Sequence, residues 1–343
     1  MAYCSPDRQL SYLDTPSFYS TALHSLTVFA IPTHLFGAYC ILFKTPKQMI
    51  SVKWSLLHLH FWTSTVDLAF GILFTPFMML PILAGLPLGI LKSNSVCIEK
   101  QTYVMVTIIA LLSVAIVCIF ENRYHVLSKD NRYWHRLRIP WYLINVIIAA
   151  TFFYPVYDRF PKDQILEREY VVNMIPCLPE EVKTSEFFVA TERPALFLRL
   201  WAAEMGFIVF QVFVFYQLIK RYFCQFGTSL SERTVMMQKK LMRALTLQLL
   251  LPLIILVVPF FYCGISSWQR YHNQALNNIS LIIIASHGFF STIAMLYIHI
   301  PYRSEIIRLL GKARLVPGEN TVGNSMQVQP SSTTGNVRQN IIT

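Results

Sequence analysis

Residues 20–43 read STALHSLTVFAIPTHLFGAYCILF, an uncharged and mostly apolar run that decides the class of this protein. A helix needs about 20 such residues to cross the roughly 30 Å of hydrocarbon in a bilayer. The run is longer than the apolar part of a cleaved signal peptide, and Asp7, Arg8 and Asp14 precede it instead of a basic stretch. We therefore expect a retained membrane-spanning helix near the N-terminus.

Further stretches of similar character follow along the chain. They lie at about 56–84, 103–120, 139–157, 196–218, 241–262 and 275–300. Charged residues make up 14% of the 343 residues, against about 25% in soluble domains. This composition excludes a disordered chain and a nucleic-acid-binding domain, although the net charge is +11. The predicted fold is an all-α bundle of seven transmembrane helices in a lipid bilayer.

Lys and Arg are distributed unevenly over the connections between these spans. Taken alternately, the connections form one set with 18 Lys and Arg, or 19 with Arg243 at the start of the sixth span, against five acids and another with 10 against 11. The first set comprises residues around 44–55, 121–138 and 219–240 and the tail from 301; the second comprises the N-terminus and residues near 85–102, 158–199 and 263–274. Because basic residues of short loops stay in the cytoplasm, we expect the N-terminus outside and the C-terminus cytoplasmic, in a multi-pass plasma-membrane protein.

Three of the seven cysteines, Cys4, Cys97 and Cys177, lie on the expected outer side. That side is oxidising and favours disulfides. Cys97 directly precedes the third span and Cys177 lies midway along the long connection after the fourth, so a predicted Cys97–Cys177 bond would tie this connection to the third helix. Cys4 is then left over, free or paired with another molecule; three free thiols are the alternative.

The inner end of the third span carries the sequence Phe120-Glu-Asn-Arg-Tyr124. An Arg beside an acid at a helix end can hold a local ion pair at rest and later release its guanidinium to a partner, although a basic membrane anchor has the same composition. With seven spans and an outer cysteine pair, the stretch resembles the acidic-Arg-Tyr motif of G-protein-coupled receptors, with one residue inserted.

A longer series of motifs narrows this resemblance. It consists of His34-Leu-Phe-Gly-Ala-Tyr-Cys-Ile-Leu-Phe-Lys-Thr-Pro46, Val52-Lys-Trp-Ser, Leu59-His-Phe-Trp62 with Asp67, Ala84-Gly-Leu-Pro-Leu-Gly89, Phe120-Glu-Asn-Arg-Tyr124 and Pro301-Tyr-Arg303. Over roughly residues 12–312 the chain resembles the nematode serpentine receptor class H, a chemoreceptor family of the Str superfamily. The resemblance implies a chemosensory receptor in the sensory cilium of chemosensory neurons, with a small-molecule ligand, a heterotrimeric G protein as partner, no cofactor and no enzymatic activity.

The spans and the composition of the C-terminal residues suggest a domain plan, and the resemblance suggests a coupling surface. The plan comprises an extracellular N-terminus (1–19), a receptor domain (20–300), an amphipathic juxtamembrane helix (301–316) and a disordered cytoplasmic tail (317–343). The residues expected to couple to the G protein are Glu121, Arg123, Tyr124, Lys239, Lys240 and Arg243.

Several residues in or beside the spans are candidates for a conformational switch or a ligand pocket. An ionisable group inside a bilayer is costly and is usually functional, so Asp67 is assigned to a switch network, with a neutral, packing carboxylic acid as the alternative. Prolines favour helix kinks. The other switch candidates are Pro252, Pro259, Pro301, Tyr302 and Arg303. The ligand-pocket candidates are Glu204 and His287. The alternative for Glu204 is a carboxylate that extends to the membrane–water interface.

Other classes of membrane protein fit less well. His58 and His60 are two residues apart and face different sides of a helix, which is poor spacing for a shared metal ion, so we expect no metal site and no hydrolase. A transporter or channel is the alternative function, but no internal repeat is visible.

Overall fold

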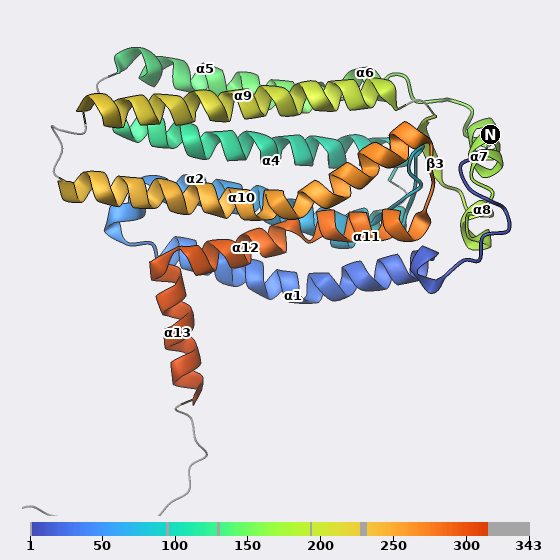
Figure 1. The fold of residues 1–343 in the computed structure, drawn as a ribbon, viewed down its shortest axis with the longest axis horizontal. Helices are drawn as coiled ribbons and strands as arrows, with labels where there is room; N and C mark the ends of the chain where they lie inside the picture. The colour runs from blue at the N-terminus through green and yellow to red at the C-terminus, as the bar shows by residue number, and fades with distance from the viewer. Residues whose placement is uncertain (1, 94–95, 129–130, 193, 227–231, 315–343) are drawn as a thin grey trace, which may run out of the picture. The chain divides into compact units, whose positions relative to one another are not determined.

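The structure, a computed structural model, describes residues 2–93, 96–128, 131–192, 194–226 and 232–314. Contacts divide the chain into two units, residues 1–305 and 306–343, and the long helices of the first unit lie alongside one another as a bundle (Figure 1). Among the described residues, seven helical stretches are long and apolar enough to cross a membrane. They are Pro16–Phe43, Ile50–Leu73, Ile98–Leu127, Arg132–Tyr157, Ala195–Gln225, Lys239–Gln269 and Gln274–Ile298. The predicted seven-helix fold is confirmed.

The elements follow one another in a simple order along the chain. The long helices are α1 (Pro16–Phe43), α2 (Ile50–Leu68), α4 (Ile98–Leu127), α5 (Arg132–Thr151), α9 (Ala195–Phe226), α10 (Glu232–Gln269), α11 (Gln274–Ala285), α12 (His287–Ile298) and α13 (Ile300–Arg314). The shorter elements are η1 (Tyr12–Asp14), η2 (Lys47–Met49), η3 (Ala69–Leu73), α3 (Ile90–Ser93), α6 (Tyr154–Tyr157), α7 (Gln164–Met174), α8 (Glu180–Lys183), β1 (Pro76–Met78), β2 (Leu83–Pro87) and β3 (Phe188–Thr191).

The second span ends earlier than the sequence pattern predicts. Its helix stops at Leu73, after a turn of π-helix, and the apolar residues up to 84 form a β-hairpin instead. Thr75, with a left-handed φ of 41°, turns the chain out of the helix. Pro76 begins β1 and Pro81 lies in the turn between β1 and β2, so neither proline is part of the helix.

A three-stranded antiparallel sheet results, in the order β1-β2-β3. Phe77 of β1 lies opposite Leu86 of β2, and Ala84 of β2 lies opposite Val189 of β3. All four side chains are buried. Strand β3, from the long connection after the fourth span, therefore extends the hairpin into a sheet, and apolar side chains of this connection are buried.

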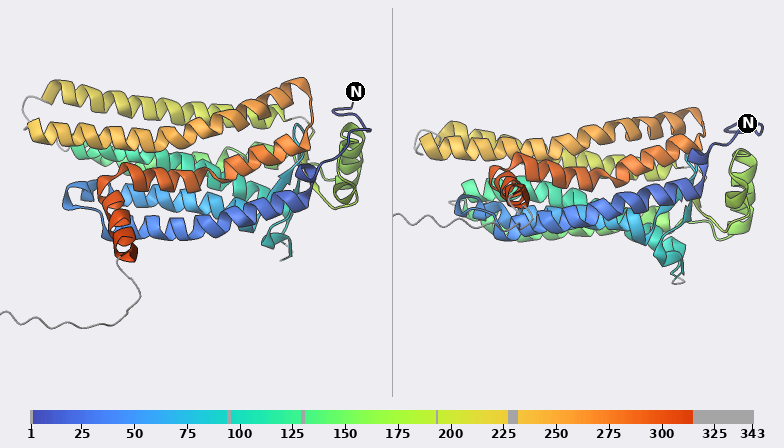
Figure 2. Two further views of the ribbon diagram at one scale, coloured as in Figure 1. Left: turned by 60° about the horizontal axis from the view of Figure 1, so that its bottom comes forward. Right: turned by 90° about the horizontal axis from the view of Figure 1, so that it is seen from below.

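The two ends of the bundle differ in what closes them. We call the end with residues 2–15, the sheet, α7, α8 and residues 270–274 the cap end, and the end with residues 44–49 and 299–305 the base end. Figure 2 shows in both views that the N-terminal segment and α7 lie at the same end of the bundle. The N-terminal segment and the long connection together cover the cap end.

The seventh span consists of two helices, because α11 and α12 meet at a break at Ser286. The sixth span, α10, is one continuous helix that bends along its length (Figure 1). On the other side, α4, α5 and α9 pack through an apolar cluster with many aromatic rings, among them Trp134, Trp141 and Phe215. The bundle thus has a tightly packed side and a side with an interrupted helix.

Helix α13 begins in the first unit and ends in the second. It lies where the amphipathic helix over 301–316 is predicted, and the last two residues of that prediction are outside the described residues. The predicted disordered tail, 317–343, also lies outside them.

Candidate functional site

Asp67, near the end of α2, lies in a buried polar cluster in the interior of the bundle. Its Oδ1 accepts a hydrogen bond from the backbone N–H of Gly288 at 3.0 Å, and its Oδ2 lies 3.1 Å from His34 Nε2. The side chains of Asp67 and His34 are almost fully buried. The predicted switch residue therefore contacts the first and seventh spans.

The break in the seventh span explains why a carboxylate is placed here. The first N–H groups of a helix have no partner within the helix, and its N-terminus carries partial positive charge. Gly288 is at the start of α12, so Asp67 satisfies one of these donors. The π-helical turn η3 directly follows α2, so both helices depart from regular α geometry beside Asp67.

His34 joins Asp67 to the rest of the cluster. Its Nδ1 lies 3.0 Å from Thr292 Oγ1, and its backbone carbonyl accepts from His60 Nε2 at 2.9 Å. Thr292 Oγ1 in turn donates to the Gly288 carbonyl at 2.9 Å. Sequence reasoning missed the roles of His34 and Thr292, and the only signal was a histidine inside an otherwise uncharged apolar run.

Glycines let the helices approach closely around this cluster. A Cβ atom on Gly37 of α1 would lie 2.8 Å from Thr292 and 2.9 Å from His60. A Cβ atom on Gly288 would overlap the Asp67 carboxylate. Both positions therefore require glycine for the cluster to close.

Small cavities flank the cluster on both sides. One, of about 10 Å³, is lined by Leu59, His60, Thr63, Gln248, Ser291, Thr292 and Met295. The other, also about 10 Å³, is lined by Leu23, Leu26, Thr27, Ala30, Asp67, Gly71 and Ala285. Each has room for about one water molecule, so a larger ligand requires the helices to separate.

The histidines of the second span do not form a metal site with Asp67. His58 accepts a hydrogen bond from Trp62 Nε1 at 3.0 Å, whereas His60 bonds to the His34 carbonyl. Within the part of the chain that the structure describes, no group of three or more His, Cys, Asp or Glu residues has metal-binding geometry.

The predicted ligand-pocket residues lie on different helices. Glu204 is buried on α9, and its Oε2 has no hydrogen-bond partner among the described residues. His287 begins α12, within electrostatic range of Asp67 and His34. Neither residue lines either of these two cavities.

At the base end, the acid of the predicted coupling motif is paired with a different residue from the one expected. Glu121 Oε2 accepts from Arg138 Nε at 3.0 Å, and its Oε1 accepts from Trp134 Nε1 at 3.0 Å. Arg138 also donates to Asn122 Oδ1 at 3.1 Å. The inserted Asn122 thus helps to tie Glu121 to α5, and the expected local pair with Arg123 is replaced.

Arg123 itself points into the bundle and is the largest fully buried side chain among the described residues, 1% exposed. Its guanidinium lies within electrostatic range of His299. Tyr124 packs its ring against Trp134 and Phe215. The motif therefore separates its charges: the acid contacts α5 and the base lies inside the base end.

The remaining coupling and switch candidates lie along α10 and at the start of α13. Lys239, Lys240 and Arg243 are exposed on α10. Pro259 is buried within α10, and the side chain of Pro252 lies outside the described residues.

Tyr302 connects the start of α13 to the end of α1. It is fully buried, and its hydroxyl lies 2.8 Å from Thr45 Oγ1. Next to it, Lys44 Nζ forms an ion pair with Glu305 at 3.1 Å, and this contact raises the pKa of Lys44. Pro301 precedes it at the start of α13, and Arg303 lies over the Tyr297 ring, 5.7 Å from its centroid.

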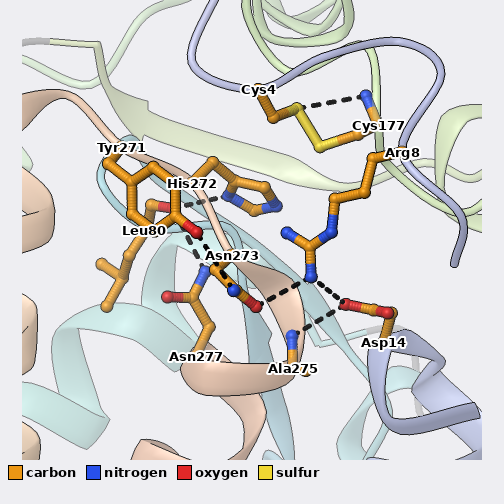
Figure 3. Close-up of a disulfide and its surroundings, with 10 residues drawn as sticks. All are labelled: Cys4, Arg8, Asp14, Leu80, Cys177, Tyr271, His272, Asn273, Ala275 and Asn277. Carbon is orange, nitrogen blue, oxygen red and sulfur yellow. Dashed lines mark hydrogen bonds and ion pairs between the residues drawn. A yellow bond between two sulfur atoms is a disulfide. The ribbon is translucent and has the colours of Figure 1, made fainter. Parts of the chain in front are cut away.

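The predicted Cys97–Cys177 disulfide is wrong, because Cys177 is bonded to Cys4 (Figure 3). Tyr3 N donates to the Met174 carbonyl at 2.7 Å, so the N-terminal segment lies beside the end of α7. The Cα atoms of Cys4 and Cys177 are 6.1 Å apart, within the usual range. Cys97 is free and exposed.

Further polar contacts hold the N-terminal segment onto the cap end, as Figure 3 shows. Arg8 forms an ion pair with Asp14 at 3.3 Å and donates to Asn273 Oδ1 at 2.9 Å. Asp14 Oδ1 also accepts from Ala275 N at 2.9 Å, at the start of α11. His272 donates from Nδ1 to the Leu80 carbonyl at 2.6 Å. The segment, the hairpin and the seventh span are therefore joined.

Comparison with known proteins gives a consistent answer. A family model described as "Serpentine type 7TM GPCR chemoreceptor Srh" matches residues 14–312. A Caenorhabditis elegans protein named "Serpentine receptor class H-72" is 25% identical over 302 residues, which cover 83% of this chain and 83% of the relative.

Proposed function

The chain belongs to the Srh family of serpentine seven-transmembrane chemoreceptors, and from this premise we propose that it binds a small molecule from the outer face and activates a heterotrimeric G protein. It is a chemosensory receptor and a multi-pass membrane protein. Membership of a receptor family implies a non-enzymatic role.

Orientation is the first part of the proposal. The cap end faces outward and the base end faces the cytoplasm, because the connections around 44–55 and 121–138 carry the excess of Lys and Arg. The receptor acts in the plasma membrane, in the sensory cilium of chemosensory neurons. An epitope inserted before Cys4 is expected to be stained on intact cells; staining that requires permeabilisation would reverse the orientation.

The coupling mechanism rests on one observation, the burial of Arg123. A guanidinium is costly to bury, so its position inside the base end favours a role that is used when the base end opens. Outward movement of α10 would expose Arg123 beside Lys239, Lys240 and Arg243, which are already exposed on α10. A ligand can drive this change only by binding the open state more tightly.

Asp67 supplies the connection between ligand and base end. Its contacts to Gly288 and His34 hold the break in the seventh span. Ligand binding that alters the angle between α11 and α12 would disturb this cluster. Glu204 and His287 are proposed to contact the ligand once the helices separate.

The test is a G-protein readout in cells exposed to a panel of volatile and water-soluble compounds. Arg123→Ala is compared with the parent and with Arg136→Ala at matched surface expression, since Arg136 is an exposed arginine of α5. We expect Arg123→Ala to abolish the response and Arg136→Ala to preserve it. An unchanged response in Arg123→Ala would contradict the coupling role, and a ligand-driven current without G protein would favour a channel.

A further inference from the structure

A hydrogen bond near the base end joins the sixth span to the seventh. Gln248 Oε1 of α10 lies 3.1 Å from His299 Nε2, and His299 is the C-cap residue of α12. Each residue is only 3% exposed. Because both partners are polar and buried, separating them without replacement bonds is unfavourable.

Gln248 also links this contact to the Asp67 cluster. It lines the cavity whose other lining residues come from α2 and α12, including His60 and Thr292. A displacement of α10 would therefore open this cavity and break the bond to His299 in the same movement.

His299 is placed where the base end is closed. Its ring packs against Tyr302 with centroids 5.5 Å apart, and the Arg123 guanidinium is within electrostatic range of it. Tyr302 is in turn held by Thr45 at the end of α1. The seventh span is thus anchored to α1 beside His299, whereas α10 reaches this anchor through Gln248.

We infer that Gln248 and His299 are positioning residues whose hydrogen bond holds α10 against the base end, where Arg123 is buried, in the resting receptor. The inference rests on the proposed function, since a contact that keeps the base end closed affects signalling only if the open state activates a G protein. Removal of the bond is expected to raise the resting population of the open state about fivefold, without any ligand.

The experiment measures opening directly, as the distance between two spin labels determined by electron–electron double resonance. It uses purified full-length receptor in nanodiscs. Labels are placed at Tyr133 and Met236, which are exposed on α5 and α10, in a background where the exposed Cys97 and Cys224 are serine. We expect Gln248→Met and His299→Asn to populate a distance at least about 2 Å longer than in the parent, beyond a minor helix shift. The reciprocal swap, Gln248→His with His299→Gln, is expected to restore the parent distribution.

Gln211→Met is the matched control. Gln211 is also a buried glutamine of a span, bonded to Trp141 at 2.8 Å and Asn145 at 2.8 Å between α5 and α9. Unchanged distances in Gln248→Met and His299→Asn, or equal opening in Gln211→Met, would overturn the inference. If the single variants are not recovered, the swap decides: a parent-like distribution supports the inference and an enlarged one refutes it.

Ligand-independent G-protein activation is measured on the same variants. Opening together with raised activation supports both the inference and the proposed function. Opening without a change in activation supports the closing contact but rejects the proposed G-protein coupling.

Discussion

At the cap end, a disulfide, an ion pair and several buried hydrogen bonds join the N-terminal segment to α7, the hairpin and the start of α11. At the base end, α10 reaches the anchored end of α12 through Gln248 and His299. From this contrast we expect a movement of α10 to pivot at the cap end and to open at the base end. The break at Ser286 and the Asp67 cluster lie between the two.

Loss of the disulfide is expected to have the largest effect on the cap end. Cys4→Ser removes a link across a sequence separation of 173 residues, and loss of a native disulfide costs about 2–5 kcal/mol. The apparent melting temperature in detergent should fall markedly. Cys97→Ser is the control and should leave the melting temperature unchanged. A larger fall in Cys97→Ser than in Cys4→Ser would instead favour the Cys97–Cys177 pairing expected from the sequence.

The next largest effect on stability is expected at the Asp67 cluster, which lies between the two ends. Gly288→Ala would place a methyl group against the Asp67 carboxylate, and overpacking of this kind costs about 1–3 kcal/mol. Surface expression and melting temperature should both fall. Gly264→Ala in α10 is the matched control, because a Cβ atom there meets nothing within 4 Å, and a similar loss in both variants would remove the special role of Gly288.

The cap end should also be sensitive to acid through His272. Burial lowers the pKa of His272 from 6.5 to about 4, more than the bond to the Leu80 carbonyl raises it. Between these values the unfolded state binds more protons than the folded state, so stability is full above about pH 6.5 and is lost as the pH falls toward 4. The loss at pH 5 is about 1–2 kcal/mol.

Thermal melting from pH 7.5 to pH 4.5 tests this dependence. His272→Asn keeps an N–H donor for the Leu80 carbonyl but does not titrate, and is expected to flatten the acid side of the curve. A variant curve parallel to that of the parent would assign the acid sensitivity to other groups.

The smallest effect is expected on the packed side of the base end. Arg138→Met leaves the buried Glu121 with its hydrogen bond from Trp134 Nε1 but without its ion-pair partner; because Arg138 is 34% exposed and the pair is screened by water, the loss in stability is about 1 kcal/mol. Melting of the variant is compared with that of Arg136→Met, which should match the parent. A loss as large as that of Cys4→Ser would mean that the base end is fastened as firmly as the cap end.

The spans were predictable because long uncharged runs have no other stable place than a bilayer. The end of the second span was not, because residues 74–84 are as apolar as the helix before them, and prolines are also found in membrane helices. Only their pairing with the distant strand β3 makes them a hairpin.

The candidate site was predictable in part. Asp67 stands out as a charge within a span, but the role of its partner His34 depends on contacts across the bundle, which the position of a histidine in an apolar run does not reveal. The predicted disulfide pairing was wrong for the same reason. The path of the N-terminal segment over the cap is set by contacts such as that between Arg8 and Asn273, which no local pattern reveals.

The pairing of Cys4 with Cys177 also has a consequence for biosynthesis. A ribosome adding about 5–20 residues per second takes roughly 10–35 s to cover the 173 residues that separate the two cysteines. In the proposed orientation, with the N-terminus in the lumen of the endoplasmic reticulum, Cys97 enters that compartment before Cys177. The native bond of Cys4 can therefore form only after Cys177 has been synthesised, late in the translation of the chain.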